Sequence, residues 1–271
     1  MARVKDTLRD LDVRPSKERG QNFVIDSSVI RTIVDFGHPS ADENIIEVGP
    51  GLGALTQELS QFPQLTTIEI EGRFCDHIKR EFPAARVVCG DIREIPLAQF
   101  GTELTIFGNL PYVYSTDIIF YMLRSAPVIK RAVFLLQREF AERLAAAPHT
   151  KAYGRLTVAT QLWASVLLGP IIPGSSFHPP TKVESALVEI TFLKAPRYPV
   201  SDPLWFEKVV KASFLQRRKK LSNSLKGAGF LSAEQVESGL AQAGIDGARR
   251  AETLSIEEFV RLAEVLLPSK V

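Results

Sequence analysis

Short runs of apolar residues alternate with helix-length amphipathic segments from Asn44 to about Leu136. Such apolar runs are typical of strands buried on both faces, and the segments between them carry apolar residues at helical spacing. The predicted strands are Ile45–Val48, Leu65–Ile70, Arg86–Cys89, Leu104–Phe107 and Ala132–Leu136, and the predicted helices are Ala54–Ser60, Arg73–Glu81, Thr116–Leu123 and Glu139–Ala147. Strands and helices that alternate at this spacing predict a parallel sheet with helices on both faces.

A helix precedes the first predicted strand, and the pattern changes after the last one. The helix spans about Ser27 to Asp35, with Asp26 or Ser27 as its cap and an apolar face formed by Val29, Ile30, Ile33 and Val34. Farther along, Trp163–Ile172 and Ala186–Phe192 indicate two strands without a crossover helix between them, which predicts an antiparallel hairpin at the sheet edge. The proline-rich segment 173–180 is expected to be an irregular loop.

The C-terminal part of the chain has a helical pattern. Three prolines between Pro196 and Pro203 indicate a linker, and the helices predicted beyond it are Leu204–Lys226, Ala233–Ala243 and Ser255–Leu267. We therefore predict an α/β domain over residues 1–198 and a small helical domain over residues 199–271.

Composition places the chain among ordinary globular proteins. Hydrophobic residues make up 45% and charged residues 24% of the 271 residues, values that disordered chains and collagens do not have. No apolar stretch approaches the length of a membrane span, and the N-terminal region mixes basic and acidic side chains without the apolar core of a signal peptide. We expect a cytoplasmic monomer that does not associate with a membrane.

The two cysteines and four histidines have no metal-site or disulfide signature. Cys75 and Cys89 form no C-x-x-C pair, so a disulfide scaffold or a zinc ribbon is not expected and reduced thiols are the default. The histidines lack the spacing of metal ligands, which predicts no bound metal; they are His38, His77, His149 and His178.

Positive charge is concentrated in one segment, although the net charge is only +2. Between Trp205 and Lys226 seven basic residues stand against one acid, Glu207. On a helical wheel most of these bases lie opposite an apolar face, whereas Arg217 and Lys220 break the pattern and indicate that the helix ends or bends there. A basic face on an anchored helix predicts phosphate binding, and a solvated helix face is the alternative. The candidate residues are Lys208, Lys211, Arg217, Arg218 and Lys219.

A glycine-rich loop follows the first predicted strand and opens the next helix. It runs from Glu47 to Gly53, and its glycines allow a tight turn and the close approach of a ligand to the backbone. Gly49 and Gly51 fit the dinucleotide pattern, and Glu69 or Glu71 follows at the distance from which a carboxylate accepts hydrogen bonds from ribose hydroxyls. The loop predicts a nucleoside cofactor, either NAD or S-adenosylmethionine, and the alternative is a purely structural turn.

Two further segments favour S-adenosylmethionine. Asp91 follows the third strand, where its carboxylate could accept a hydrogen bond from an adenine amino group, and Asn109-Leu110-Pro111-Tyr112 follows the fourth. An exocyclic amine is a poor nucleophile because its lone pair is delocalised into the ring. The Asn109 side-chain oxygen and the Leu110 carbonyl could accept its two N–H groups and align the nitrogen with a donor methyl. Tyr112 could stack on the base.

The chain resembles the KsgA family of ribosomal RNA adenine N6-dimethyltransferases in eight segments that occur in the family's order. They are Gly20 to Phe23, Glu47 to Gly53, Gly90-Asp91, Asn109 to Tyr112, Gln137 to Ala145, Tyr153 to Leu156, Phe177 to Ser185 and Phe214 to Leu225. The resemblance implies a class I methyltransferase fold, which is Rossmann-like, and S-adenosylmethionine as the cofactor. It further implies dimethylation of two adjacent adenosines in a hairpin near the 3′ end of 16S rRNA, within the 30S subunit or its precursor.

The resemblance also implies roles for single residues. The cofactor would be held by Asn22, Val24, Gly49, Gly51, Glu69, Asp91 and Asn109, with Glu69 at the ribose and Asp91 at the adenine amino group. Tyr112 and Phe177 would sandwich the flipped target adenine. We expect Phe177 to be exposed, because the proline, glycine and serine residues around it cannot build a core. The sequence departs from the family where Val24 replaces leucine and where Val113-Tyr114 replaces Asn-Ile.

Three other functions fit parts of the sequence. A large-subunit RNA methyltransferase of the macrolide-resistance type shares the cofactor and the adenine chemistry, but the Asn109 to Tyr112 motif and the Phe214–Leu225 segment favour the small-subunit enzyme. A non-catalytic RNA-binding assembly factor would not need Asn109 or the cofactor acids. An NAD oxidoreductase would fit the glycine loop but gives no reason for the Asn109 to Tyr112 motif.

Overall fold

The computed structural model describes residues 2–16 and 20–268, which form two compact units. The first unit comprises Met1–Ala141 and Val166–Phe192, and the second comprises Glu142–Ser165 and Leu193–Val271. This division differs from the predicted boundary at residues 198 and 199, because the segment 142–165 packs with the C-terminal helices. No helix in the described ranges is long and apolar enough to cross a membrane.

A seven-stranded sheet forms the centre of the first unit. Its order is β4 (Arg86–Cys89), β3 (Leu65–Glu69), β2 (Ile45–Val48), β5 (Leu104–Asn109), β6 (Ile129–Gln137), β9 (Ser185–Phe192) and β7 (Ala164–Ile172). The first five strands pair in parallel, and β9 pairs antiparallel with β6. The predicted mostly parallel α/β sheet is therefore confirmed, and β7 and β9 lie at its edge as expected.

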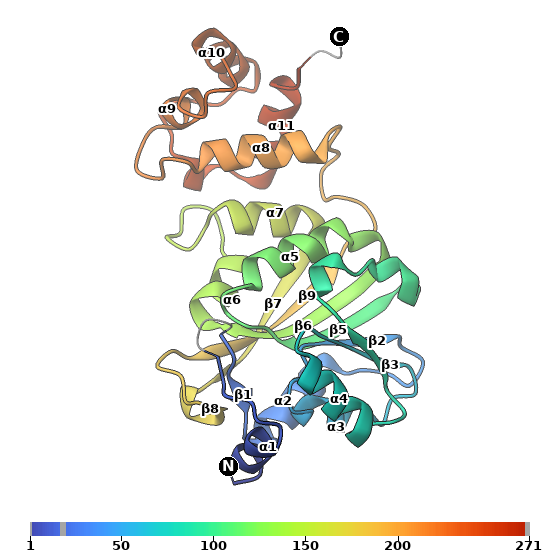
Figure 1. Ribbon diagram of the computed structural model, residues 1–271. Coiled ribbons are helices and arrows are strands. Elements are labelled where there is room, and N and C mark those ends of the chain that lie inside the picture. Colours follow the sequence, from blue (N-terminus) through green and yellow to red (C-terminus); the bar gives the residue numbers. More distant parts are fainter. Residues whose placement is uncertain (1, 17–19, 269–271) are drawn as a thin grey trace. The chain divides into compact units, whose positions relative to one another are not determined.

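Helices cover both faces of the sheet. The helices of the first half are α2 (Ser27–Gly37), α3 (Ala54–Leu59), α4 (Gly72–Glu81) and α5 (Ser115–Arg124). Figure 1 shows α2, α3 and α4 on one face and α5 on the other. Every position of β2 and β3 is buried, as expected for strands covered on both sides. Asp26 caps α2 by accepting a hydrogen bond from the Ser28 amide, as predicted.

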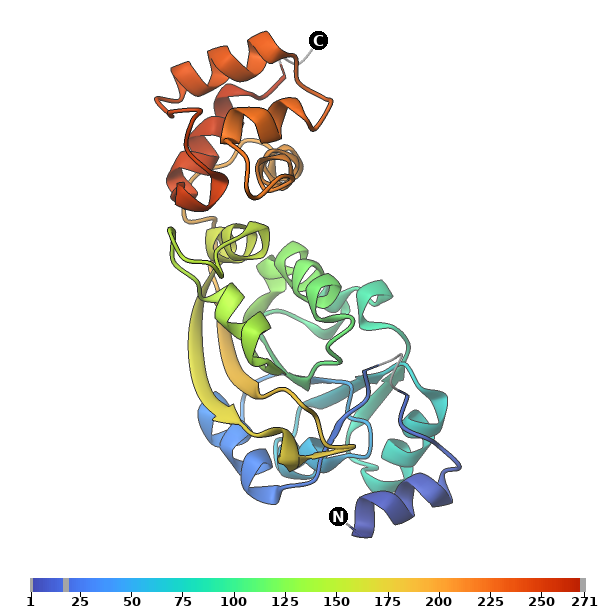
Figure 2. The same cartoon turned by 90° about the vertical axis from the view of Figure 1, so that its left-hand side faces the viewer.

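The N-terminal segment contains structure that the hydrophobic pattern did not predict. Helix α1 (Ala2–Asp10) precedes the two-residue strand β1 (Phe23–Val24), which pairs antiparallel with β8 (Phe177–His178). In Figure 2 the blue segment that contains β1 lies beside the yellow segment that contains β8. The segment 173–180 is therefore not wholly irregular, because two of its residues pair with a strand that is distant in the sequence.

The second unit is helical, as predicted, but its longest predicted helix is broken. Its main helices are α7 (Arg155–Trp163), α8 (Pro203–Ser213), α9 (Leu221–Lys226), α10 (Ala233–Gln242) and α11 (Ile256–Val265). Turns occupy residues 214–218, so the continuous helix expected from Leu204 to Lys226 is wrong, and the break falls where Arg217 and Lys220 indicated it. Phe206, Val209 and Leu221 of the expected apolar face are buried in the core of this unit.

Candidate active site and cofactor cavity

The carboxyl ends of four neighbouring parallel strands bring the predicted site residues together. Gly49 follows β2, Glu69 ends β3, Asp91 follows β4 and Asn109 ends β5. Parallel strands end at the same edge of a sheet, and ligands bind in the crevice outside that edge. A cavity of about 1210 Å³ lies there and is lined by all four residues and by Asn22 and Tyr112.

The glycine loop forms one wall of this cavity in a conformation that requires glycine. Gly49 and Gly51 have φ values of 70° and 53°, in the left-handed region that side chains disfavour. A Cβ atom built on Gly49 would meet no atom within 4 Å, so open space lies beside its backbone. A ligand can therefore approach the Gly49 backbone closely, as predicted for a cofactor loop.

Glu69 is held in place by backbone amides at the end of β3. Its Oε2 accepts a hydrogen bond from the Gly51 amide at 3.1 Å, and its Oε1 accepts one from the Glu71 amide at 2.9 Å. Each carboxylate oxygen has a second lone pair that a ligand hydroxyl could use. Burial raises the pKa of Glu69 above its ordinary value, although these amides oppose the shift.

Asp91 has a partner that the sequence analysis missed. Arg93 donates from Nε to Oδ1 at 3.0 Å and to Oδ2 at 3.1 Å, and its own backbone amide donates to Oδ1. The side-chain hydrogen bonds from Arg93 lower the pKa of Asp91. The guanidinium also lies 5.0 Å from the centroid of the Tyr114 ring and forms an ion pair with Asp117. Arg93 therefore shares the carboxylate that was predicted to accept from an adenine amino group.

The side chain of Asn109 is oriented by the N-terminal segment. Its Nδ2 donates a hydrogen bond of 2.8 Å to the main-chain carbonyl of Asn22. Because the amide nitrogen is used in this way, the side-chain oxygen Oδ1 is the atom of Asn109 left to accept from a ligand. Asn22 thus reaches the site through its backbone, and its own side chain donates to the Gly20 carbonyl.

Tyr112 lies on the same wall as Asn109 and is anchored at its far end. Its hydroxyl is 2.8 Å from Oγ of Ser185, the first residue of β9. The side chain is half-buried, and this burial raises the pKa of the phenol. A fixed ring that lines a cavity is able to stack on a planar ligand. Leu110, between these two residues, is buried and donates its amide to the Leu135 carbonyl at 3.3 Å.

Phe177 is not exposed, so that expectation is wrong. Only 1% of its surface is accessible, and it packs among residues of α2 and β1 that include Val24, Val29 and Ile30. The neighbours of Phe177 in sequence cannot build a core, but the pairing of β8 with β1 brings in distant residues that do. In this conformation Phe177 offers no ring face to a ligand, and Val24 is buried beside it.

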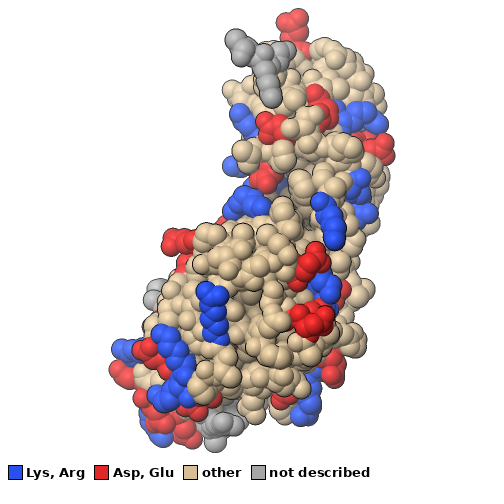
Figure 3. All heavy atoms as spheres, turned by 90° about the vertical axis from the view of Figure 1, so that its right-hand side faces the viewer, with Lys and Arg blue, Asp and Glu red and all other residues tan. Residues whose placement is uncertain are grey.

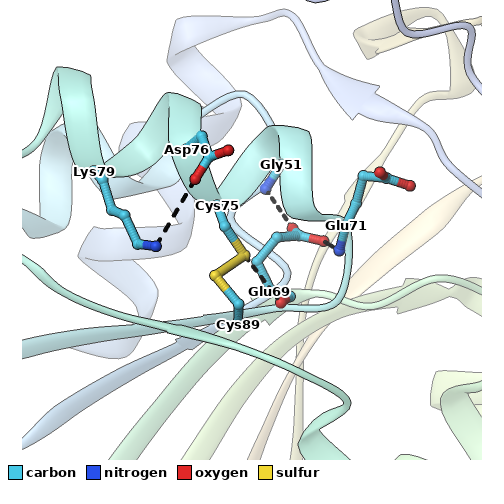
Figure 4. The surroundings of a disulfide bond; sticks show 7 residues. All are labelled: Gly51, Glu69, Glu71, Cys75, Asp76, Lys79 and Cys89. Carbon is cyan, nitrogen blue, oxygen red and sulfur yellow. Dashed lines mark hydrogen bonds and ion pairs between the residues drawn. A yellow bond between two sulfur atoms is a disulfide. The ribbon is translucent and has the colours of Figure 1, made fainter.

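The two cysteines form a disulfide beside the cofactor cavity, contrary to the expected reduced thiols. Cys75 lies on α4 and Cys89 ends β4, and Figure 4 shows the bond next to Glu69. Fourteen residues separate them in the sequence, yet their Cα atoms are 6.0 Å apart because α4 packs against β3 and β4. The Cys75 sulfur also lies 3.3 Å from the main-chain oxygen of Glu69.

The basic segment of the second unit contains both structural and exposed cations. Arg217 donates to the Lys151 and Tyr153 carbonyls and pairs with Glu252 at 3.3 Å, so its guanidinium is already used within the unit. Lys211, Arg218 and Lys219 are exposed and have no ion-pair partner among the described residues. Lys208 lies 4.3 Å from the centroid of the Phe230 ring. Because α8 ends at Ser213, these bases do not form one continuous stripe along a single helix.

Charge is mixed on the face that Figure 3 shows, and the described residues contain no metal cluster. Figure 3 shows one face, on which lysine and arginine side chains are interspersed with aspartate and glutamate. No group of three or more histidine, cysteine or acidic side chains within the described ranges could hold a metal ion.

The fold and the cavity define a class I methyltransferase architecture, and comparisons with known proteins identify the family. The family model for ribosomal RNA adenine dimethylase matches residues 14–267. The chain therefore belongs to the ribosomal RNA adenine dimethylase family, and the resemblance inferred from the motifs is confirmed.

Full-length relatives carry a more specific name. The ribosomal RNA small subunit methyltransferase A of Geobacter metallireducens is 40% identical over 270 residues, which cover 96% of this chain and 98% of that protein. The protein of the same name from Myxococcus xanthus is 38% identical over 273 residues, which cover 99% of this chain and 96% of that one.

Solved structures support the same fold. A dimethyladenosine transferase from Plasmodium falciparum superposes with a TM-score of 0.76 at 22% identity and covers 89% of this chain and 95% of its own. The 23S rRNA methyltransferase ErmE superposes with a TM-score of 0.66 at 26% identity and covers 90% of this chain and 99% of its own.

Proposed function

We propose that this enzyme transfers methyl groups from S-adenosylmethionine to the N6 atoms of two adjacent adenosines near the 3′ end of 16S rRNA. The observation that carries the proposal is the amide of Asn109, whose nitrogen is held by the Asn22 carbonyl and whose oxygen is left for a ligand in the cavity. Two relatives over nearly the full length that are named small subunit methyltransferases are 38–40% identical, whereas ErmE is 26% identical. The small-subunit target is therefore favoured over the large-subunit one.

The residues of the cavity fit S-adenosylmethionine. Open space beside Gly49 admits the amino-acid part of the cofactor against the backbone, and the oriented carboxylate of Glu69 suits ribose hydroxyls. Asp91 would accept from the adenine amino group through the lone pairs that Arg93 leaves. When bound, the cofactor supplies an electrophilic methyl group. Neither a metal nor NAD chemistry would explain the Asn109 to Tyr112 arrangement.

The protein's own contribution to the chemistry is positioning of the amine. Asn109 Oδ1 and the Leu110 carbonyl would accept the two N–H groups of the target and turn the nitrogen lone pair toward the donor methyl. Tyr112 would stack on the extruded base, because a base inside a paired helix cannot reach the cavity. After transfer the nitrogen is cationic and strongly acidic, so water can accept its proton without a dedicated base.

Replacement of Tyr112 should separate stacking from hydrogen bonding. We expect Tyr112→Ala to weaken RNA binding by about 1–3 kcal/mol, the range measured for loss of a stacked base. Tyr112→Phe keeps the ring and loses only the hydroxyl contacts with Ser185 and Thr181, so its RNA affinity should stay close to that of the parent. Equilibrium binding to a small-subunit RNA hairpin checks both variants. Equal affinities for the alanine variant and the parent would remove Tyr112 from the target pocket.

The exposed bases of the second unit are proposed to bind RNA phosphates. We expect charge reversal at Lys211 and Arg218 to reduce the slope of log K against log salt by about 0.7–0.9 for each lost contact. Arg250→Glu is the matched control, because Arg250 is an exposed arginine of the same unit outside the basic segment. Binding measured from low to moderate salt checks this. If the double variant has the same slope of log K against log salt as the parent, the basic segment is a solvated surface that does not bind RNA.

The target subunit is tested by methyl transfer to separated ribosomal subunits. Incubation with radiolabelled S-adenosylmethionine should label small-subunit RNA and leave large-subunit RNA unlabelled. We further expect the protein to act as a monomer in the cytoplasm, on the 30S subunit or its precursor. Label in the large subunit alone would instead support the macrolide-resistance type of enzyme.

A further inference from the structure

Arg93 is a charged side chain of the cofactor cavity to which the proposed mechanism gives no role. It lies two residues after Asp91, in the short helix η1 (Ile92–Glu94), and it lines the cavity together with Asp91 and Tyr114. Its side chain is 34% exposed, and that of Asp91 is 16% exposed. A cation held this close to a ligand-binding carboxylate can either compete with the ligand or orient the carboxylate for it.

Arg93 contacts both carboxylate oxygens of Asp91. Oδ1 accepts from the Arg93 backbone amide at 2.9 Å, and Oδ2 accepts from Nη2 at 2.5 Å. Nε lies between the two oxygens, 3.0 Å from Oδ1 and 3.1 Å from Oδ2. A carboxylate offers about four lone-pair sites to hydrogen-bond donors. These three donors of Arg93 therefore leave Asp91 room for one further N–H group.

The guanidinium of Arg93 is itself fixed by the start of α5. Its Nη1 forms an ion pair of 3.5 Å with Asp117, and its Cζ lies 5.0 Å from the centroid of the Tyr114 ring. The Tyr114 amide donates to the Pro111 carbonyl at 3.1 Å, which closes the turn before α5 and holds the ring in place. Arg93 is thus held on one side by Asp91 and on the other by two residues of α5 and its cap.

We propose that Arg93 is a positioning residue that sets the Asp91 carboxylate for the adenine amino group, so that the cofactor site selects adenine. This inference rests on the proposed cofactor and on Asp91 as its acceptor. An acceptor that is fixed before binding loses no side-chain freedom when the ligand arrives. The one lone-pair site that remains matches one N–H of the amino group, so only a ligand with that group gains from the arrangement.

Two effects of Arg93 on adenine binding oppose each other. The guanidinium offsets the charge of Asp91 and weakens it as an acceptor, whereas the fixed orientation strengthens adenine binding. Without the Arg93 side chain, the backbone amide would still hold Oδ1, but Oδ2 would be free to turn toward solvent. The ion pair with Asp117 compensates part of the guanidinium charge, so we expect the orienting effect to be the larger one.

Titration calorimetry with two ligands measures this selectivity in the intact protein. The ligands are S-adenosylhomocysteine and its 6-deamino analogue, in which a hydrogen atom replaces the adenine amino group. The ratio of their affinities isolates the contact of that group, because the two ligands share all other parts. The wild-type protein should prefer S-adenosylhomocysteine by about tenfold or more, as expected for a hydrogen bond to a charged acceptor. A general distortion of the site would weaken both ligands alike and leave the ratio unchanged.

Three variants test the contacts of Arg93. Arg93→Gln should lower the preference by about three- to tenfold, the cost of ordering one side chain on binding. The backbone amide of residue 93 still donates to Asp91 in this variant, so the short helix keeps its cap. Arg93→Lys keeps the charge but not the planar fork, and it should lose preference as well. Tyr114→Leu removes the ring beside the guanidinium and should lower the preference less.

Arg86→Gln is the matched control. Arg86 lies on β4, and its Cζ is 5.0 Å from the centroid of the Phe100 ring, the same distance as that from Arg93 to the Tyr114 ring. Arg86 is not one of the described residues that line the cavity, so its variant should keep the wild-type preference. Asp91→Ala gives the other limit, because without the acceptor the protein should bind both ligands with nearly equal affinity.

Each outcome decides between the alternatives. An unchanged ratio in Arg93→Gln or in Arg93→Lys overturns the inference, and so does a higher ratio in Arg93→Gln, because Arg93 would then compete with adenine. Should these variants fail to fold, an unchanged ratio in Tyr114→Leu decides against it. A wild-type protein that binds both ligands equally overturns the inference but leaves the proposed methyl transfer intact. Failure of the wild-type protein to bind S-adenosylhomocysteine at all would contradict the cofactor assignment itself.

Discussion

Asn109→Ala should slow methyl transfer by about 10²–10³-fold, by analogy with the loss of one oriented hydrogen-bond partner of a transition state. The expected loss falls on the chemical step, because the target nitrogen becomes pyramidal only as it attacks the methyl group. Binding of RNA and cofactor should change little, since Oδ1 contacts neither the phosphates nor the glycine loop in the proposed complex. The structure supports this role because the Asn22 carbonyl already fixes the amide nitrogen.

Single-turnover kinetics with saturating RNA and cofactor separates this effect from binding. Asn109→Asp is the informative companion, because it keeps an acceptor oxygen but places a carboxylate against the Asn22 carbonyl instead of an N–H donor. It should therefore misplace the acceptor and react more slowly than the parent, although it can still accept from the amine. If Asn109→Ala reacts at the parent rate with saturating RNA and cofactor, Asn109 only shapes the pocket and does not orient the amine.

Glu69→Ala should weaken cofactor binding by about 1.5–3 kcal/mol, the range for hydrogen bonds that involve a charged group. The carboxylate is oriented by the Gly51 and Glu71 amides, so its loss removes the acceptor for the ribose and one support of the glycine loop. Isothermal titration with S-adenosylmethionine measures the effect. Glu71→Ala is the control, because Glu71 is the other acid at this position of the dinucleotide pattern and should matter less.

The pH dependence of this prediction follows from burial. Burial raises the pKa of Glu69. As the pH falls, Glu69 therefore becomes protonated, and stops being an ionised acceptor, at a higher pH than an ordinary glutamate does. The affinity of the parent protein for the cofactor should therefore decline as the pH is lowered. The affinity of Glu69→Ala should decline less over the same pH range. Unchanged affinity of Glu69→Ala at neutral pH would exclude Glu69 from the ribose site.

The parts of the fold that depend on local pattern could be predicted from the sequence. The strands Ile45–Val48 and Arg86–Cys89 have the bounds expected of them, because a short apolar run ending in glycine is a local signal. The alignment of Glu69, Asp91 and Asn109 along one edge followed from the parallel order of their strands. The site was predictable to that extent because topology alone brings these residues together.

The other features of the fold and the site depend on contacts between distant segments, which a local sequence pattern does not encode. Phe177 is buried because β8 pairs with β1, more than 150 residues away in the sequence. The contact of Asp91 with Arg93 could have been suspected, because only one residue separates them in the sequence. The contacts of Arg217 instead depend on how Tyr153 and Glu252 pack around it. The pairing of Cys75 with Cys89 likewise depends on the packing of α4 on the sheet.

Dimethylation of two neighbouring adenosines of small-subunit RNA can be measured directly. Small subunits that lack these methyl groups are incubated with the protein and isotopically labelled S-adenosylmethionine, and the RNA is then digested and analysed by mass spectrometry. We expect one fragment, from near the 3′ end of 16S rRNA, in which two adjacent adenosines each gain two labelled methyl groups. Asn109→Ala should produce little of this fragment in the same time. Unlabelled 16S rRNA, or labelled adenosine only in 23S rRNA, would contradict the proposed function.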